Sequence, residues 1–235
     1  MSVRLSGISK AQTLAGLHQF SGLNDAARDY LATAAVLGNI KRHEYLVQRN
    51  GAADSFYVVV QGRLEVSLSA DGGFNKVIEI AGAGDQVGEA MMFCGGNHLI
   101  DARAITALTY IQLKKADCLH AMSLDPHFAQ RLLEAMSARF VTLLADIKAT
   151  NSLTARERLY QFLLNEPREA NLVRLSVSKG TIASMLGIAK ETLSRELQRL
   201  TAEGLIRVEG ARIELIDPPV VEQPCPNLPR QLASQ

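Results

Sequence analysis

The segment from Asp125-Pro126 to about Asn151 contains no glycine and no further proline. Asp can cap the amino end of a helix, and Pro suits its first turn because its φ angle is already helical. A helix of about 26 residues would be ~39 Å long at ~1.5 Å per residue, which is longer than a small domain needs to cover its core. The sequence therefore predicts one long helix that separates an N-terminal from a C-terminal part.

The apolar residues of this helix form two stripes. The first stripe has the three- and four-residue spacing of a heptad seam and consists of Leu133, Met136, Phe140, Leu143 and Ile147. The second stripe contains Phe128, Leu132, Val141 and Leu144. We predict that the seam pairs with the same helix of a second copy, giving a homodimer, and that the second stripe packs on the N-terminal domain. The alternative is a single helix buried within a monomer.

Short β-branched and aromatic runs separated by glycine dominate the N-terminal part. Between residues 64 and 68 apolar and polar residues alternate with period two, as in a half-buried strand. Further strands are expected over 56–60, 76–80 and 102–113, and the turn signals between them are typical of an antiparallel roll. Two helices are expected before them, over 8–20 and over 25–37, the second capped by Asn24.

The C-terminal part changes pattern again after residue 153. We expect a helix over 154–164, a strand over 172–177 and then two short helices, Lys179–Leu186 and 190–203, which Gly187 separates. Two helices joined by a glycine-containing turn form a helix-turn-helix, and a hairpin over 205–215 would be its wing. The fold class is therefore α+β, with a β-roll over 1–124, the long helix over 125–151, a winged helix-turn-helix over 152–217 and a loose tail over 218–235.

The composition excludes several classes of function. With 25 Lys and Arg against 24 Asp and Glu, the net charge of +1 excludes a strongly basic nucleic-acid binder, so any DNA binding must be local. No signal-peptide or membrane-spanning pattern is found, so we expect a cytoplasmic protein without a membrane partner. Three scattered cysteines cannot form a disulfide framework or a four-cysteine metal site. No nucleophile–base constellation or P-loop is found either, so we do not expect an enzyme.

Four features occur in a particular order along the chain. They are the segment Gly51–Gly62, the turn Gly84–Glu89, the long helix, and the segment Ile182–Ile206, which is the most specific of the four. In this order they resemble the transcription regulators of the Crp/Fnr family, and the resemblance covers nearly all of residues 23–217. It implies an effector-sensing β-roll of the cyclic-nucleotide-binding type, a dimerisation helix and a winged helix-turn-helix that binds double-stranded DNA.

The second short helix carries a polar face suited to reading bases. Glu191, Ser194 and Arg195 lie at i, i+3 and i+4, and so share one side of the helix. Arg can donate two parallel hydrogen bonds to guanine, Glu can accept from cytosine, and Ser is adaptable. The alternative is a solvated face with an intrahelical Glu–Arg pair, which the surrounding helix-turn-helix spacing makes the weaker interpretation.

The resemblance adds a role for each position. It implies that Arg195 reads guanine beside Glu191, and that Ser178 and Lys179 hold phosphate. The stretch Lys190–Arg195 is similar to the signature of Fnr-like readers, because Ser194 stands where Crp-like readers have Gly. The resemblance therefore implies an inverted repeat with TTGAT-like half-sites.

The sensor part departs from the cyclic AMP receptors of the family. It keeps Gly88 and Glu89, but no Arg or Lys occurs between Glu89 and Arg103 to hold a cyclic phosphate, and Asp101 would repel an anion. We therefore expect no cyclic AMP. Fnr itself uses an N-terminal cysteine cluster, whereas the first cysteine here is Cys94, so we expect no iron–sulfur cluster.

The stretch after Gly88 resembles Dnr-like regulators of denitrification, which sense nitric oxide through a haem. We therefore expect an effector pocket with a candidate haem, formed by Gly88, Glu89, Met91, Met92 and His98. His98 stands near the place of the missing Arg and is the candidate axial ligand. His18, His120, Cys94 and the two methionines are the other candidates, and each could equally be a surface or packing residue.

Together these features predict a homodimeric regulator that contacts RNA polymerase if it is an activator. The same fold could instead respond to another small effector or act constitutively. A function of a different class would be an effector-binding module whose winged domain contacts only proteins.

Overall fold

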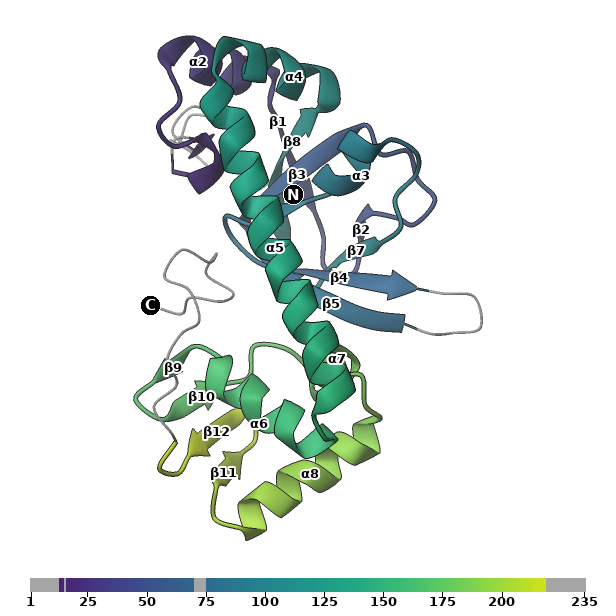
Figure 1. Cartoon of the computed structure of the whole chain (residues 1–235), viewed down its shortest axis with the longest axis vertical. Coiled ribbons are helices and arrows are strands. Elements are labelled where there is room, and N and C mark those ends of the chain that lie inside the picture. Colours follow the sequence, from purple (N-terminus) through teal and green to yellow (C-terminus); the bar gives the residue numbers. More distant parts are fainter. Residues whose placement is uncertain (1–12, 15, 70–74, 219–235) are drawn as a thin grey trace. The chain divides into compact units, whose positions relative to one another are not determined.

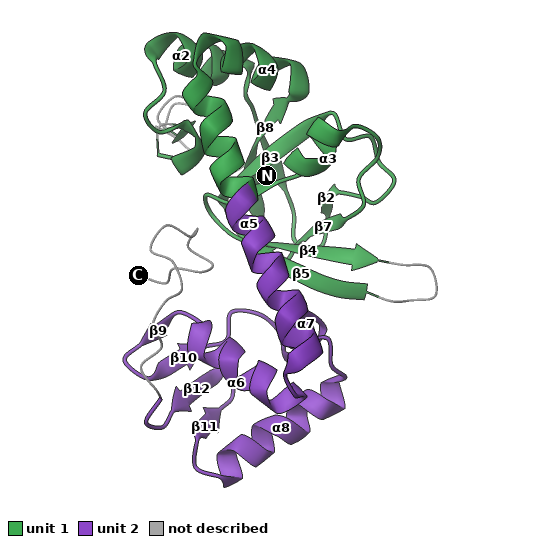
Figure 2. Cartoon of the chain, viewed as in Figure 1, with its two compact units in different colours: residues 1–136 green, residues 137–235 purple. Residues whose placement is uncertain are grey.

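The computed structural model describes residues 13–14, 16–69 and 75–218 of the chain (Figure 1). These residues fall into two compact units, residues 1–136 and residues 137–235 (Figure 2). Helix α5, Pro126–Ser152, belongs to both units. The predicted long helix is confirmed, and its bounds differ from those expected by one residue at each end.

Unit 1 contains two four-stranded antiparallel sheets. In the first sheet the strand order is β1-β8-β3-β6, which are Val36–Ile40, Leu108–Lys114, Ser55–Gln61 and Gln86–Val87. In the second sheet the order is β2-β7-β4-β5, which are Tyr45–Val47, Asp101–Ala104, Leu64–Ser69 and Asn75–Ala81. Buried residues of both sheets share one core, for example Val59 of the first and Val66 of the second. The predicted β-roll is confirmed.

Helices cover a second core in unit 1. They are η1 (His18–Phe20), α2 (Asp25–Ala34), α3 (Glu89–Cys94) and α4 (Lys115–Leu124). As predicted, Asn24 caps α2, its Oδ1 accepting from the backbone N–H of Ala27 at 2.9 Å. The beginning of α5 completes this core, because Phe128 and Leu132 are buried in it together with Met92 of α3.

Several elements of unit 1 differ from the sequence predictions. The helix expected to reach residue 37 ends at Ala34, and the next residues form β1, which pairs with β8. The single strand expected over 102–113 is two strands, β7 and β8. Strands β1, β2 and β6 and helices α3 and α4 were not predicted. Of the helix expected over 8–20, residues 8–12 and 15 lie outside the described residues, and the described part contains the short 3-10 helix η1 over His18–Phe20. The turn at 71–73 and residues 219–235 of the tail also lie outside the described residues.

Unit 2 is a winged helix-turn-helix. Helix α6 (Ala155–Asn165) begins with a capping box formed by Thr154 and Glu157. Helices α7 (Lys179–Leu186) and α8 (Lys190–Ala202) follow, and a sheet of order β11-β12-β10-β9 completes the unit, with strands Ile206–Glu209, Arg212–Leu215, Leu172–Arg174 and Arg168–Glu169. The predicted helix-turn-helix and hairpin are confirmed. Strand β10 ends three residues earlier than expected, and β9 was not predicted.

The two apolar stripes of α5 have different environments. In the single chain, Leu133, Phe140, Leu143 and Ile147 of the heptad seam are exposed, and Met136 is partly buried. In the second stripe Phe128 and Leu132 are buried, but Val141 is 51% and Leu144 48% exposed. The prediction that the whole second stripe is packed is therefore wrong for its C-terminal half.

Within the described segments, none of the helices combines the length and the apolar character that a membrane span requires.

One buried carboxylate joins the beginnings of α2 and α5. Asp125 is 4% exposed, and its two oxygens accept hydrogen bonds from the backbone N–H groups of Asn24 at 2.6 Å and of His127 at 3.0 Å. These hydrogen bonds, that of Asn24 first, lower the pKa of Asp125. A carboxyl group whose folded-state pKa is lowered stabilises the fold above its unfolded pKa, and this stabilisation is lost as the pH falls through the folded-state value.

We predict that Asp125→Asn unfolds more easily than the wild type at pH 7, and that the difference shrinks as the pH falls below about 4. Denaturant unfolding of both proteins between pH 7 and pH 2.5 measures this. A difference that stays constant across the range would show that the charge of Asp125 is not what stabilises unit 1.

Candidate DNA-binding interface and effector region

The turn between α7 and α8 depends on the backbone conformation of Gly187. Its φ angle is +64°, in the left-handed region that glycine adopts without strain. This conformation lets the backbone N–H of Ile188 donate to the carbonyl oxygen of Ala183 at 3.0 Å, which closes the end of α7. Gly187 therefore sets the angle at which the chain enters α8.

Apolar residues on one side of α8 hold it against the rest of unit 2. Leu193, Leu197 and Leu200 are buried with Ile182 and Ala183 of α7 in one core. The residues predicted to contact DNA all lie outside this core and are exposed, namely Ser178, Lys179, Lys190, Glu191, Ser194 and Arg195. The structure thus places all six where a ligand can reach them.

Three of these residues lie close together at the beginning of α7. Ser178 is the N-cap, its Oγ accepting from the backbone N–H of Thr181 at 3.1 Å, and Lys179 is the first helical residue. Lys190 crosses from α8, since a Cβ on Gly180 would lie 2.8 Å from its Cε and 3.3 Å from its Nζ. Helix N-termini attract anions, and two lysines reinforce this attraction, so the arrangement suits a phosphate.

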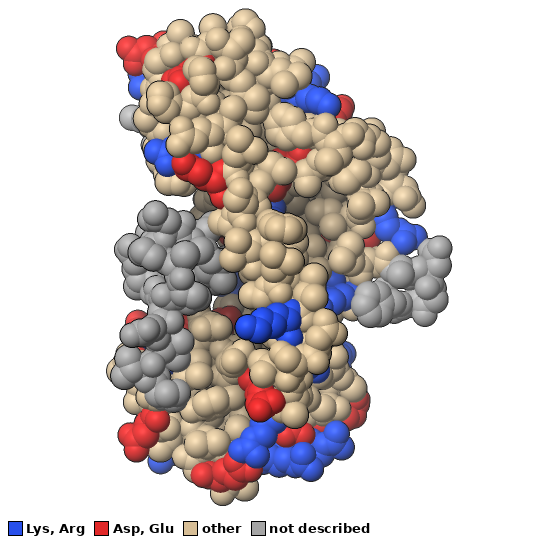
Figure 3. Space-filling model, viewed as in Figure 1, with Lys and Arg blue, Asp and Glu red and all other residues tan. Residues whose placement is uncertain are grey.

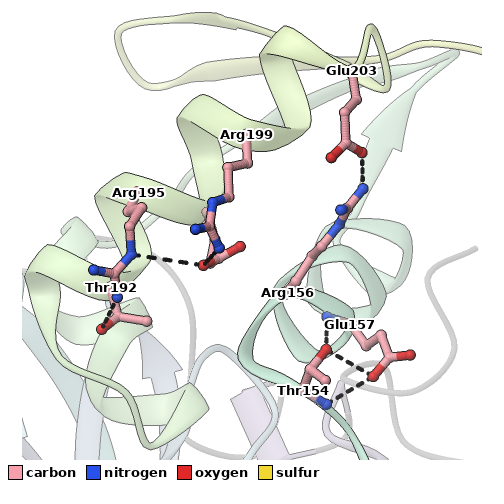
Figure 4. Close-up of polar contacts among 8 residues, drawn as sticks. Thr154, Arg156, Glu157, Thr192, Arg195, Arg199 and Glu203 are labelled. Atoms are coloured by element: carbon pink, nitrogen blue, oxygen red, sulfur yellow. Dashed lines mark hydrogen bonds and ion pairs between the residues drawn. The ribbon is translucent and has the colours of Figure 1, made fainter.

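The remaining three residues are spread along α8. The guanidinium of Arg195 donates to Thr192 Oγ1 at 3.4 Å, and its side chain is 59% exposed. Figure 4 shows Arg195 and Arg199 projecting from successive turns of α8. In the space-filling view, Lys and Arg side chains gather over α8 with acidic residues interspersed (Figure 3). This face can offer guanidinium, carboxylate and hydroxyl groups to base edges.

In unit 1 the structure brings two predicted effector residues together. A Cβ on Gly88 would lie 3.3 Å from His98 Cε1 and 3.3 Å from the carbonyl oxygen of Ser55, so the φ of +98° at Gly88 and the lack of a side chain are both needed there. His98 is 4% exposed, and its Nδ1 has no hydrogen-bond partner within the described part of the chain. Burial lowers the pKa of His98, while the nearby charge of Asp54 opposes this effect.

The other predicted effector residues differ in environment. Glu89 and Met92 are buried, and Met91 is partly buried. The alternative haem ligands His18 and Cys94 are exposed, and the ring of His120 packs on Tyr30 of α2 with centroids 4.4 Å apart. Most of the alternative ligands therefore lie at the surface.

Two charged residues, Asp101 and Lys115, alter the charge expected around the predicted effector residues. Asp101 is engaged within the roll, because its carboxylate accepts from the backbone N–H of Arg49 and from Ser69 Oγ, each at 2.9 Å. Lys115 donates to the carbonyl oxygen of Phe93 in α3 at 3.5 Å. Lys115 lies outside residues 89–103, the stretch in which the sequence has no Lys or Arg before Arg103, and it reaches α3 although 22 positions separate it from Phe93.

Comparisons with known proteins match both parts of the chain. Residues 37–125 match the cyclic nucleotide-binding domain family and residues 157–223 the Crp-like helix-turn-helix domain family. The chain is 29% identical to the transcriptional activator protein Anr of Pseudomonas protegens over 188 residues, 76% of each chain, and 26% identical to the transcriptional activator protein FnrA of Stutzerimonas stutzeri over 215 residues, 87% of each. The chain belongs to the Crp/Fnr family. The solved structure of FixK2 from Bradyrhizobium japonicum shows the same fold, with a TM-score of 0.68 at 24% identity over 77% of this chain and 92% of that one.

As a Crp/Fnr-family protein, the chain is a DNA-binding transcription regulator and not an enzyme. Two charged residues of α8, one on its exposed face and one beneath it, were not predicted from the sequence. Arg199 follows Arg195 by one helical turn, and the buried Glu196 accepts from Arg199 Nη1 at 2.9 Å. The four-residue spacing of the two arginines could have indicated Arg199, whereas nothing local marks Glu196 as buried.

We predict that Gly187→Ala destabilises unit 2 by about 1 kcal/mol, because an L-residue at this φ is strained. No atom lies within 4 Å of the added Cβ, so the effect is confined to the backbone. Gly187→Asn is the matched control, since Asn tolerates the left-handed region and should lose less. Denaturant unfolding checks the order of stability, and an alanine variant as stable as the wild type would contradict it.

Proposed function

We propose that this Crp/Fnr-family regulator binds, as a homodimer, an inverted repeat with TTGAT-like half-sites. The observation that carries the proposal is the exposed face of α8, where Glu191, Ser194 and Arg195 lie opposite the buried leucines. Arg195 reads guanine through two parallel hydrogen bonds, and Glu191 and Ser194 contact neighbouring bases. A helix that enters the major groove needs one side packed on its own domain and the other side exposed to the bases.

Phosphate contacts fix the register of this helix on the duplex. Ser178 and Lys179 begin α7, and the side chain of Lys190 lies beside Gly180, so that an ammonium group and backbone N–H donors at the helix start favour an anion. Such contacts add affinity without sequence preference, whereas base contacts add specificity. The start of α7 therefore supplies affinity for the phosphate backbone, and the exposed face of α8 supplies sequence specificity.

The exposed seam of α5 supports the dimer. Leu133 is 63%, Phe140 61% and Ile147 58% exposed in the single chain. Apolar residues repeated with heptad spacing and left in water favour pairing with a second helix of the same kind. A two-fold dimer then presents its two α8 helices to half-sites whose centres lie about one helical turn apart, which explains the inverted repeat. If the regulator is an activator, as the names of two relatives state for those proteins, RNA polymerase is a further partner.

Haem as the effector stays a prediction. The Nδ1 of His98 suits an axial ligand because it has no hydrogen-bond partner within the described residues. The imidazole ring, however, is 4% exposed and packs against Gly88. A porphyrin therefore cannot reach Nδ1 while His98 is buried in this position. Haem therefore fits only if His98 leaves its packing against Gly88.

We predict that Arg195→Ala weakens binding to the inverted repeat by about 1–3 kcal/mol and flattens discrimination at the contacted G·C pair. Lys179→Ala serves as the comparison, because losing a phosphate contact should weaken all duplexes alike and reduce the salt slope by about one unit. Duplex titration by fluorescence anisotropy at several salt concentrations measures both. Equal losses of Arg195→Ala on repeat and scrambled DNA would mean that Arg195 contacts only phosphate.

We predict that Phe140→Asp yields a monomer that has lost operator binding, because a carboxylate buried in the seam has no partner. Ala145→Asp is the control: Ala145 is also exposed on α5 but occupies the outer position of the same heptad. Sedimentation measures the oligomeric state of both variants. A dimeric Phe140→Asp variant would show that the seam is not the dimer interface.

We predict that cyclic AMP leaves DNA affinity unchanged, and that the purified protein binds haemin with a Soret band that responds to nitric oxide or carbon monoxide. His98→Ala should alter that band, whereas His120→Ala should not, because the His120 ring packs on Tyr30. Absorption spectra of the three proteins test this. Tight operator binding by protein that takes up no haem would contradict the gas-sensor prediction and leave a different effector or none.

A further inference from the structure

A buried carboxylate lies beneath the DNA-binding face of α8. Glu196 is 5% exposed, although the helix around it is strongly polar. Its Oε1 accepts from Arg199 Nη1 at 2.9 Å and lies 3.9 Å from Arg195 Nε. Its Oε2 is also buried and accepts no hydrogen bond from any described residue. A carboxylate removed from water is stabilised by cations, and Glu196 has one on each side.

Each arginine contacts described residues through only part of its guanidinium group, Arg195 through Nε and Nη2 and Arg199 through Nη1. Their side chains are 59% and 60% exposed, for Arg195 and Arg199 respectively. Arg195 also donates to Thr192 Oγ1, as Figure 4 shows. Its guanidinium therefore contacts both Thr192 and Glu196. The remaining N–H groups of both guanidinium groups are available to a ligand on the exposed side of α8. The unused Oε2 gives the carboxylate capacity for a closer contact with Arg195.

We propose that Glu196 is a positioning residue for DNA recognition: its buried carboxylate holds Arg195 in the orientation that reads guanine and Arg199 in one that contacts phosphate. The proposal rests on the proposed function of Arg195. It assigns to Glu196 no contact with DNA, because the side chain lies beneath the surface that would meet the duplex.

Two effects of the carboxylate act in opposite directions on different duplexes. Ordering a long side chain at an interface lowers affinity by about threefold to tenfold, and a side chain that is already ordered avoids this loss. The specific complex, which needs Arg195 in one orientation, gains most from it. The negative charge of Glu196 also weakens the general attraction of the face for phosphate. Glu196 therefore raises affinity for the cognate site relative to other DNA.

The test compares Glu196→Gln with Glu203→Gln in the full-length protein. Both substitutions remove one negative charge from an Arg–Glu contact, that of Glu196 within α8 and that of Glu203 at its C-cap, but the partner of Glu203 is Arg156 rather than a DNA-facing arginine. The measured quantity is the ratio of dissociation constants for a scrambled duplex and for the duplex with the TTGAT-like inverted repeat. We expect this ratio to fall about threefold to tenfold in Glu196→Gln, with scrambled DNA bound as tightly as before or more tightly, and to stay unchanged in Glu203→Gln.

This pattern separates positioning from a purely structural role. A variant that is merely less folded would bind both duplexes more weakly by the same factor, and that result would overturn the proposal. So would a Glu196→Gln variant whose ratio equals that of Glu203→Gln. If Glu196→Gln does not fold, Glu196→Leu replaces the buried charge by an apolar side chain of similar size, a change that buried positions often tolerate, and the same fall in the ratio is expected.

Discrimination between the two duplexes by the wild type tests the proposed function separately from the role of Glu196. A wild type that does not discriminate between the duplexes would overturn the proposed function and this inference together. A wild type that discriminates, with Arg195→Ala abolishing the difference and Glu196→Gln leaving it intact, would overturn this inference alone.

Discussion

The packing of the leucine side of α8 onto α6 and α7 determines what the C-terminal unit can do. Leu193, Leu197 and Leu200 are buried with Leu159 and Leu163 of α6. Because the leucine side of α8 is packed, its opposite side faces solvent. Every polar residue on that side then has a defined position relative to the turn at Gly187. A helix that could roll about its axis would present no fixed pattern of donors and acceptors to a base pair.

Polar groups beneath that surface refine what the apolar core determines. The core fixes the position of the Cα atom of Arg195. An arginine side chain has many rotamers, however, and its guanidinium group can reach many positions on the exposed side of the helix. Contacts with Thr192 and Glu196 narrow this range. The proposed interface thus has two layers, an apolar layer that positions the helix and a polar layer that would position the ends of its longest side chains.

The first unit connects its effector region to α5 through a single core. Met92 of α3 is buried with Phe128 and Leu132, which belong to the first two turns of α5. A ligand that displaced α3 would therefore disturb a core that also contains side chains of α5. His98 and Gly88 lie at the beginning of this connection, since Gly88 is the N-cap of α3 and packs against the His98 ring.

Local patterns in the sequence were sufficient for much of this fold. Asp125-Pro126 and the lack of glycine after it predicted α5, Ser178 and Gly187 marked the ends of α7, and period-two alternation predicted β4. The geometry of one helix or strand is set by neighbours within a few residues. The same spacing placed Glu191, Ser194 and Arg195 on one face. The resemblance of four ordered motifs then supplied the family, which the comparisons confirm.

Tertiary structure decided what depends on partners distant in the sequence. Residues 36 and 37, expected at the end of a helix, belong to strand β1 because β8, about 70 residues later, supplies the hydrogen bonds of that strand. Lys115 reaches α3, and Glu196 is buried, only because separate segments pack around them. Helix periodicity is a property of the local backbone, and it can be read from the chain alone. Burial of a charge is a property of everything that surrounds it, and only the folded structure defines those surroundings.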